Sequence, residues 1–222
     1  MPIRLAALDV DGTLKEAVSP YQYLHGRLGV AQLAATNRHL ALSGRIDYAE
    51  WLRRDVGLWA GQRADDLCSL LAENPYLPGA RELLRALKEA GVFVALVSAG
   101  FTLNTDPIVA EFGLDYALAN QLGIGTDGCL DGTAISRVPK GGKGVFVREL
   151  MARLSVQPEE VLAAGDTQDD LELFECAGLR LAVNPLSEQL RARADAVFEP
   201  DLSPAVAWLR ARGSLPVNGG DR

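Results

Sequence analysis

Long apolar runs, clustered cations and histidines are all scarce in this chain of 222 residues. Apolar stretches such as residues 92–97 are far too short to cross a bilayer, and no signal-peptide pattern precedes the first strand-like segment. A net charge of -7 without a Lys/Arg cluster argues against nucleic-acid and anionic-membrane partners. The three scattered cysteines, Cys68, Cys129 and Cys176, lack metal-ligand spacing and fit a reducing compartment. We therefore expect a soluble, cytoplasmic protein, and the sequence carries no signal of its oligomeric state.

Short apolar segments alternate with amphipathic ones along most of the chain. Each of the first four apolar segments ends on a small or polar residue, as buried parallel strands do where ligands bind. The strand-like segments are 5–10, 92–98, 161–165, 179–184 and 196–199. The helical patterns between and after them are 80–90, 143–154, 169–177 and 204–211. This repeat predicts an α/β fold with a doubly wound parallel sheet, to which residues 116–136 add a hairpin that turns at Thr126-Asp127-Gly128.

One stretch, from Ala17 to about Asn74, breaks this alternation. It offers four amphipathic helical patterns with no strand between them, at 20–28, 31–42, 47–58 and 64–71. We expect a small helical cap domain at 16–76, inserted into a core domain made of 1–15 and 77–213. The Gly-rich, polar residues 214–222 predict a flexible tail.

Carboxylates follow the first and the third expected strand. Asp9 and Asp11 are two positions apart, so along an extended chain both side chains can point to the same side at the end of the strand. Gly12 then allows a sharp turn. Such a pair repels itself unless a cation or a shared proton compensates, which implies a divalent metal. An ordinary Asp-Gly turn is the plain alternative. Three further carboxylates, Asp166, Asp169 and Asp170, follow the segment 161–165, and a helix N-cap accounts for only one of them.

A hydroxyl and a lysine complete the set of candidate residues. Ser98 and the backbone N–H groups of Ala99 and Gly100 follow the second strand and could receive phosphate oxygens, although Ser-Ala-Gly is common loop chemistry. Lys143 is held between glycines at an expected helix start. Lys140 is a rival for its role, and an isolated lysine is often an ordinary surface residue.

In chain order these segments supply an acidic pair, a hydroxyl, a lysine and an acidic cluster. This ordered set resembles the four motifs of the haloacid dehalogenase superfamily, over residues 5 to about 212. The chain is most similar to the phosphoserine phosphatase branch, through the segments 97–101, 114–120, 143–144 and 163–166. The helical insertion also matches the small cap of that branch.

The resemblance implies the catalytic roles and the cofactor. Asp9 would be the nucleophile, and Asp11 would be the general acid for the leaving oxygen and then the base for water. Magnesium would bind to Asp9, the backbone carbonyl of Asp11, and Asp166, an oxygen-only set that suits this hard ion.

The resemblance also implies the residues that hold the phosphoryl group. Ser98, the N–H of Ala99 and Lys143 would bind its oxygens, while Asp170 would support the metal site from behind. Asp169 departs from the branch, which usually has Asn there, so an extra negative charge is expected near the phosphate and the metal.

The expected cap departs from the branch at the residues that recognise the serine head group. A glutamate and an arginine of the branch align with Val18 and Asp55 here, and a carboxylate cannot clamp a carboxylate because like charges repel. Neighbouring Glu16, Arg53 and Arg54 are possible substitutes. The cap is also rich in aromatic residues, most of which helical spacing predicts to be core.

These observations predict a magnesium-dependent phosphomonoester hydrolase that acts on a small phosphorylated metabolite through an aspartyl-phosphate intermediate. We expect free L-phosphoserine not to be its best substrate. Two alternatives remain open. The chain could be a binding or regulatory protein that keeps the phosphate pocket without turnover, which Asp169 alone favours. It could also be a mutase or phosphotransferase that passes the phosphoryl group to an acceptor other than water.

Overall fold

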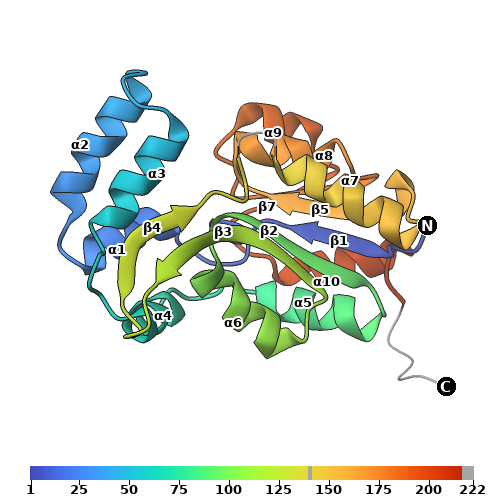
Figure 1. The fold of residues 1–222 in the computed structure, drawn as a ribbon. Helices are drawn as coiled ribbons and strands as arrows, with labels where there is room; N and C mark the ends of the chain where they lie inside the picture. The colour runs from blue at the N-terminus through green and yellow to red at the C-terminus, as the bar shows by residue number, and fades with distance from the viewer. Residues whose placement is uncertain (140–141, 217–222) are drawn as a thin grey trace.

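The computed structural model describes residues 1–139 and 142–216, and its centre is a seven-stranded sheet (Figure 1). The strand order is β4-β3-β2-β1-β5-β6-β7, and neighbouring strands are parallel except for the antiparallel pair β3 and β4. The strands are β1 (Leu5–Leu8), β2 (Phe93–Phe101), β3 (Tyr116–Ile124), β4 (Leu130–Ile135), β5 (Val161–Gly165), β6 (Leu179–Val183) and β7 (Ala196–Phe198). The helices are α1 (Pro20–Arg27), α2 (Ala31–Leu42), α3 (Tyr48–Gly57), α4 (Ala64–Ala72), α5 (Ala80–Glu89), α6 (Thr102–Phe112), α7 (Gly142–Leu154), α8 (Leu171–Phe174), α9 (Glu188–Arg193) and α10 (Ser203–Ala211).

Helices cover both faces of the sheet, because successive side chains of each strand point to opposite sides. In β1, Ala6 and Leu8 pack into the apolar cluster that includes α5, α6 and α10. Leu5 and Ala7 pack into the cluster on the other face, with α7, α8 and α9. The doubly wound α/β fold is therefore confirmed, as is the hairpin formed by β3 and β4.

Several features of the core differ from the sequence analysis, among them α9, a helix of six residues that no helical pattern predicted. Helix α6 was not predicted, because Pro107 lies inside it and no side chain caps its start. Proline has no backbone N–H to donate to the carbonyl of Leu103, four residues earlier. That carbonyl lies 3.9 Å from the Cys68 sulfur instead. The flexible tail expected at 214–222 begins too early: Ser214 and Leu215 are buried, and the Ser214 carbonyl accepts a hydrogen bond from the N–H of Ile3. Composition alone did not reveal that Leu215 completes the core; residues 217–222 lie outside the described part.

Helices α1–α4 lie together beyond the β3–β4 end of the sheet. The two chain segments that join them to the sheet run side by side: the N–H of Glu16 bonds to the carbonyl of Pro75, and that of Leu77 to the carbonyl of Leu14. The Lys15 ammonium ties the same two segments, since it donates to the carbonyl of Asn74 and lies over the Tyr76 ring, 4.3 Å from its centre.

The hairpin is attached to the four helices as well. The N–H of Gly61 donates to Leu130, and the N–H of Leu130 donates to Gln62, so β4 pairs locally with the loop after α3. Trp59 is fully buried in an apolar cluster shared by these helices and the hairpin, and it packs edge-on against Phe101 of β2. The helices and the sheet therefore share one apolar contact region.

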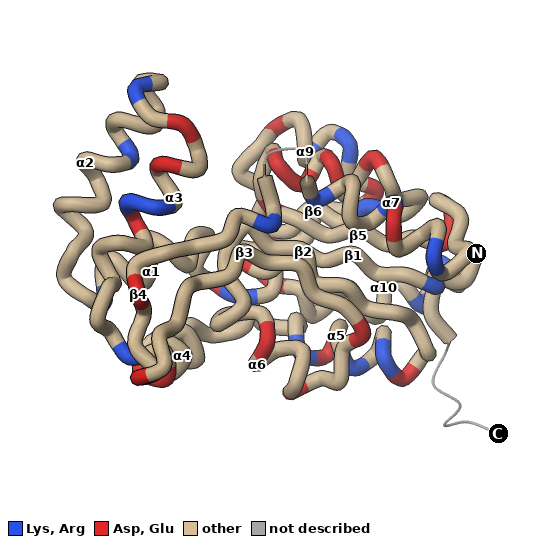
Figure 2. The backbone as a smooth tube through the Cα atoms, in the orientation of Figure 1, with Lys and Arg blue, Asp and Glu red and all other residues tan. Residues whose placement is uncertain are grey.

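Charged residues of both signs are interspersed on the helices of both faces, and the central strands β1, β2 and β5 carry none (Figure 2). No helix among residues 1–139 and 142–216 is long and apolar enough to span a membrane.

Candidate active site

The carboxylate of Asp9 lies at the carboxyl end of β1 and faces a buried lysine. Lys143 Nζ, from the first turn of α7, is 2.6 Å from Asp9 Oδ1 and 2.7 Å from Asp170 Oδ1. Burial lowers the pKa of this ammonium, but the charges of Asp9 and Asp170 outweigh burial and raise its pKa overall. Lys143 is therefore a fixed positive charge beside the Asp9 carboxylate.

Three carboxylates, those of Asp9, Asp166 and Asp170, offer oxygen atoms within 4.8 Å of one another. Asp170 is already engaged: besides Lys143, its other oxygen accepts hydrogen bonds from the backbone N–H groups of Asp166 and Thr167 and from the Thr167 hydroxyl. Asp166 Oδ2, in contrast, is buried and has no hydrogen-bond donor in the described part of the chain. This all-oxygen cluster suits a hard divalent cation, with Asp9 and Asp166 as the available ligands and Asp170 as the support behind them.

Backbone conformation makes room for this cluster at Gly12. Its φ is +84°, and a Cβ placed there would lie 2.2 Å from Asp166 Oδ2. Thr13 follows in the same turn, and its hydroxyl lies 3.2 Å from Asp9 Oδ2 and 3.4 Å from Asp166 Oδ1, so it bridges the two carboxylates. The glycine that the sequence marks as a turn is thus also needed for the close approach of β1 and β5 at this edge.

The carboxyl groups at the site hold their protons more tightly than free carboxyl groups do. Burial raises the pKa of Asp9 to about 6, although Lys143 opposes the shift. Burial, together with the charge of Asp9, raises the pKa of Asp11 to about 7 and that of Asp166 to about 9. A bound cation would oppose these shifts by favouring the ionised forms.

Asp11 is held by partners other than the lysine. Its Oδ2 accepts a hydrogen bond of 2.9 Å from the Ser98 hydroxyl, and its Oδ1 accepts one of 2.8 Å from Asn104 Nδ2. Ser98 Oγ in turn accepts a hydrogen bond of 2.8 Å from the N–H of Gly100. These contacts orient Asp11 toward the end of β2 and the first turn of α6, so the two carboxylates of the Asp-Val-Asp motif have different partners.

Asn120 of β3 holds the same end of β2 in place. Its side-chain Nδ2 lies 2.8 Å from the carbonyl of Ala99, 3.2 Å from the Tyr48 hydroxyl and 3.4 Å from the Tyr21 hydroxyl. Its Oδ1 accepts hydrogen bonds from the backbone N–H groups of Arg137 and Val138. One buried amide therefore connects the end of β2 with α1, α3 and the segment after the hairpin.

The structure brings most of the predicted site residues to one edge of the sheet. Two contiguous networks contain six of them: Asp9, Asp166, Asp170 and Lys143 in one, and Asp11 and Ser98 in the other; Ala99 follows Ser98. Asp169 differs, because it is exposed at the surface, whereas Asp170 is fully buried. Lys140, the rival of Lys143, lies outside the described residues.

Sequence reasoning missed three polar residues that position this site: Thr13, Asn104 and Asn120. Thr13 had a signal, since it directly follows the Asp-Gly turn. Asn104 had none as long as α6 was not predicted. Asn120 lay in a segment used for the resemblance, but a strand residue whose partners come from four other segments cannot be assigned a role from its neighbours in the chain.

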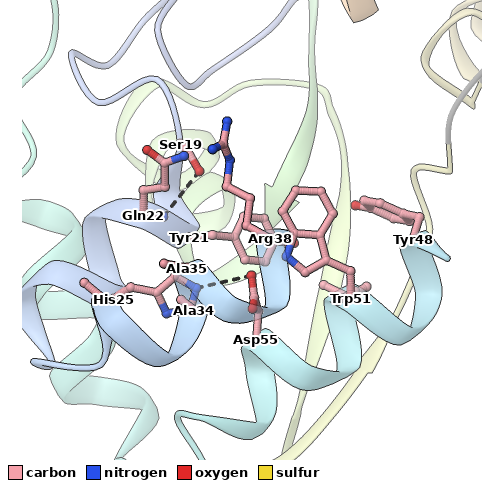
Figure 3. Close-up of a pocket in the computed structure, with 12 residues that line it drawn as sticks. Ser19, Tyr21, Gln22, His25, Ala34, Ala35, Arg38, Tyr48, Trp51 and Asp55 are labelled. Carbon is pink, nitrogen blue, oxygen red and sulfur yellow. Dashed lines mark hydrogen bonds and ion pairs between the residues drawn. The ribbon is translucent and has the colours of Figure 1, made fainter. Parts of the chain in front are cut away.

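A cavity of about 490 Å³ lies among α1, α2 and α3, and Figure 3 shows the residues that line it. Asp55 is one of these residues; it is buried, and it accepts a hydrogen bond from Asn37 and lies 3.3 Å from His25 Nε2. Val18, the other departure from the branch, is exposed and does not line the cavity.

The possible substitutes for the serine clamp do not line this cavity either. Arg53 and Arg54 both bind the Glu50 side chain on their own helix, and Glu16 is exposed. Four of the aromatic cap residues, Trp51, Tyr21, Tyr48 and His25, contribute to the wall, whereas Trp59 is core as expected.

Comparison with known proteins places this site in a family. The family model of haloacid dehalogenase-like hydrolases matches residues 6–175. The phosphoserine phosphatase of Streptomyces coelicolor is 35% identical over 207 residues, which are 93% of this chain and 50% of that protein. The phosphoserine phosphatase of Archaeoglobus fulgidus is 37% identical over 182 residues, which are 82% of this chain and 52% of that protein. The chain thus spans about half the length of these curated relatives.

A solved structure of a phospho-aspartyl intermediate analogue of phosphoserine phosphatase superposes with a TM-score of 0.78 and 28% identity, covering 94% of this chain and 99% of that one. The family match includes the strand ends that carry Asp9, Ser98 and Asp166. This chain belongs to the haloacid dehalogenase-like hydrolase family. The resemblance to its phosphoserine phosphatase branch is confirmed.

Proposed function

We propose that this chain is a magnesium-dependent phosphomonoester hydrolase that acts on a small phosphorylated metabolite. The observation that carries the proposal is the pairing of the buried Asp9 carboxylate with Lys143 beside a buried, donor-free oxygen of Asp166. A nucleophile, a fixed cation and free metal-ligand oxygens are what phosphoryl transfer requires, since it depends mainly on positioning and charge neutralisation. Phosphatase relatives that share the fold add support.

In the proposed reaction, an oxygen of Asp9 forms a bond to phosphorus while the bond from phosphorus to the leaving oxygen breaks. Asp11 gives its proton to that oxygen. A water then attacks the phosphorus of the aspartyl phosphate, Asp11 takes the proton of the water, and the bond to Asp9 breaks to release phosphate. Dividing the displacement into two steps through a covalent intermediate lowers the barrier to each.

The remaining site residues would hold the phosphoryl group and the cofactor. Lys143, the hydroxyl of Ser98 and the N–H of Ala99 would bind phosphoryl oxygens. Asp9, Asp166 and the backbone carbonyl of Asp11 would hold magnesium. When bound, this ion supplies positive charge that offsets the developing charge on the phosphoryl oxygens.

The cap and the cellular location belong to the same proposal. We propose that residues 16–76 form the cap over a core made of 1–15 and 77–213, and that the cap excludes bulk water from the aspartyl phosphate. The three cysteines are free thiols, which supports a reducing compartment and hence the cytoplasm.

The test is the Asp9→Asn variant, assayed with a generic aryl phosphate and magnesium. Because an amide has the shape of the carboxylate but cannot act as this nucleophile, we expect no turnover and an unchanged circular dichroism spectrum. Substantial activity in that variant would exclude the mechanism. Wild-type reactions in heavy-oxygen water, run with and without an alcohol acceptor, separate hydrolysis from transfer: a hydrolase incorporates the heavy oxygen into the released phosphate.

A further inference from the structure

We infer that the cavity among α1–α3 receives the leaving group of the substrate, and that this group is apolar, preferably aromatic, with an anionic substituent that Arg38 binds. The inference rests on the proposed function, which it extends from phosphomonoesters in general to a class of alcohol.

The cavity adjoins the end of β2, where Ser98 and Ala99 would hold the phosphoryl group. Tyr21, on its wall, has its hydroxyl 3.2 Å from the carbonyl of Ala99, and Tyr48 reaches the same carbonyl through Asn120. A Cβ at Gly100 would lie 2.9 Å from the Pro20 ring at the start of α1, which confirms how closely the helices approach this loop. The tyrosine wall of the cavity therefore borders the residues that would bind the phosphoryl group, and the inferred path of the leaving group runs past this wall between α1 and α3.

The lining of the cavity is shaped for a flat, apolar group. Alanines of α2, among them Ala31 and Ala35, leave space opposite the rings of Tyr21, Tyr48 and Trp51 (Figure 3). The volume of about 490 Å³ lies in the range of sites for small organic ligands and is several times the size of a serine. Aromatic walls gain most from a ring or another large apolar surface.

The one carboxylate on the wall is not available to a ligand ammonium. Asp55 Oδ1 accepts from Asn37 Nδ2 at 2.9 Å, and its Oδ2 faces His25 Nε2 at 3.3 Å. The other ring nitrogen of His25 accepts a hydrogen bond from the Trp59 indole N–H at 3.1 Å, so Nε2, which lies beside Asp55 without forming a hydrogen bond to it, carries the ring proton. This chain of contacts serves the packing of the three helices.

The wall groups that do lack partners are donors. Arg38 is exposed on α2 and has no hydrogen bond or ion pair with any residue of the described ranges. The indole nitrogen of Trp51 is buried and has no acceptor among the same residues. Because a buried donor is costly until an acceptor arrives, a ligand that brings acceptor oxygens, and above all an anion for the guanidinium, fits this wall. Free phosphoserine would bring an ammonium that finds no free carboxylate.

The test compares four substrates: acetyl phosphate, benzyl phosphate, 4-carboxybenzyl phosphate and L-phosphoserine, each with magnesium. We expect the wild type to prefer 4-carboxybenzyl phosphate, then benzyl phosphate, with L-phosphoserine below both by kcat/KM. In Arg38→Ala, the ratio of kcat/KM for 4-carboxybenzyl to that for benzyl phosphate should fall roughly tenfold, as expected for one charge-assisted hydrogen bond at a partly exposed site. Arg45→Ala is the matched control, since Arg45 is exposed just after the same helix and does not line the cavity; its ratio should stay unchanged.

A second variant tests the shape of the cavity independently of charge. Ala35 is exposed on the wall, so Ala35→Leu adds volume without disturbing the core, and it should lower kcat/KM for benzyl phosphate roughly tenfold relative to acetyl phosphate. The inference is overturned if L-phosphoserine ranks first, or if both ratios stay at their wild-type values. If the wild type hydrolyses none of the four, acetyl phosphate included, the proposed function itself has failed.

Discussion

Adding a single methyl group at Gly12 should separate a general backbone cost from a specific loss of the metal site. An alanine in the left-handed conformation, with φ near +84°, costs about 1–2 kcal/mol. In Gly12→Ala the new carbon would also meet Asp166 Oδ2 at 2.2 Å, so the carboxylate has to leave its position. Gly61→Ala is the matched control, because its φ is +81° and nothing lies within 4 Å of the added carbon.

The two variants should differ in their response to magnesium. For a domain of this size, about 1–2 kcal/mol lowers the Tm by roughly 2–8 °C, and both variants share this loss. At a magnesium concentration of about a hundred times the wild-type Kd, binding stabilises the wild type and Gly61→Ala by about 2.7 kcal/mol. If displacing Asp166 weakens binding by about a hundredfold, the gain in Gly12→Ala shrinks to about 0.4 kcal/mol.

The assay is thermal unfolding followed by circular dichroism across a magnesium titration, with steady-state kinetics at saturating metal. We expect the Tm of Gly61→Ala to rise with magnesium as the wild type does, while that of Gly12→Ala stays nearly flat and its kcat/KM falls about a hundredfold. Equal magnesium responses in the two variants would refute the assignment of Asp166 as a ligand whose position depends on Gly12.

Three further predictions concern the same edge of the sheet. Asp166→Ala should raise the magnesium concentration needed for half-maximal activity sharply, and EDTA should inactivate the wild type; an unchanged titration would remove Asp166 from the metal site. Asn104→Ala removes the hydrogen bond of 2.8 Å from Asn104 Nδ2 to Asp11 Oδ1, so kcat/KM for an aryl phosphate should fall about tenfold or more while the fold is retained. Wild-type kinetics in this variant would show that Ser98 alone positions Asp11. Without metal, the raised pKa values of Asp9, Asp11 and Asp166, about 6, 7 and 9, make the folded state bind more protons than the unfolded state. The free energy of unfolding should therefore fall as the pH rises from about 4 to about 9, and magnesium should flatten this trend. A Tm in EDTA that rises with pH over that range would contradict the prediction.

The sequence predicted the parts of the fold that repeat locally. Buried strands and the amphipathic helix α5 can be recognised from apolar patterns within a few residues. The carboxyl ends of parallel strands lie at one edge of a sheet regardless of the conformation of the loops. For this reason Asp9 and Asp166 could be placed together from the sequence, whereas Lys143, at a helix start, was assigned to the site by the family resemblance. Helix α6 was not predicted because Pro107 has a low helix propensity, which tertiary packing overrides. The role of Asn104, which lies in this helix, was missed for the same reason.

Contacts that join distant segments were beyond sequence reasoning. Alignment with the branch put Asp55 where a clamp residue stands, but only the packing of α1 against α3 shows that His25 and Asn37 engage this carboxylate. The same packing turns Arg38 toward the cavity and leaves Arg53 with Glu50. Such choices depend on which rotamers the neighbouring helices allow, and no chain-local pattern contains that information.

The paired segments at residues 14–17 and 74–77 limit how the helices can move against the sheet. Two separate linkers would let the inserted helices translate, twist and swing independently. Here backbone hydrogen bonds and the Lys15 ammonium join both linkers into one narrow ribbon, and a ribbon bends easily across its flat face but resists shear and in-plane rotation. A movement of α1–α4 about this ribbon alone would be close to a single hinge angle, although it would also have to break the contacts of Trp59 and of the loop after α3 with the sheet. Closure about such a hinge would bring the Tyr21 hydroxyl back to the carbonyl of Ala99, so recognition of the leaving group and alignment of the phosphoryl group would depend on the same movement.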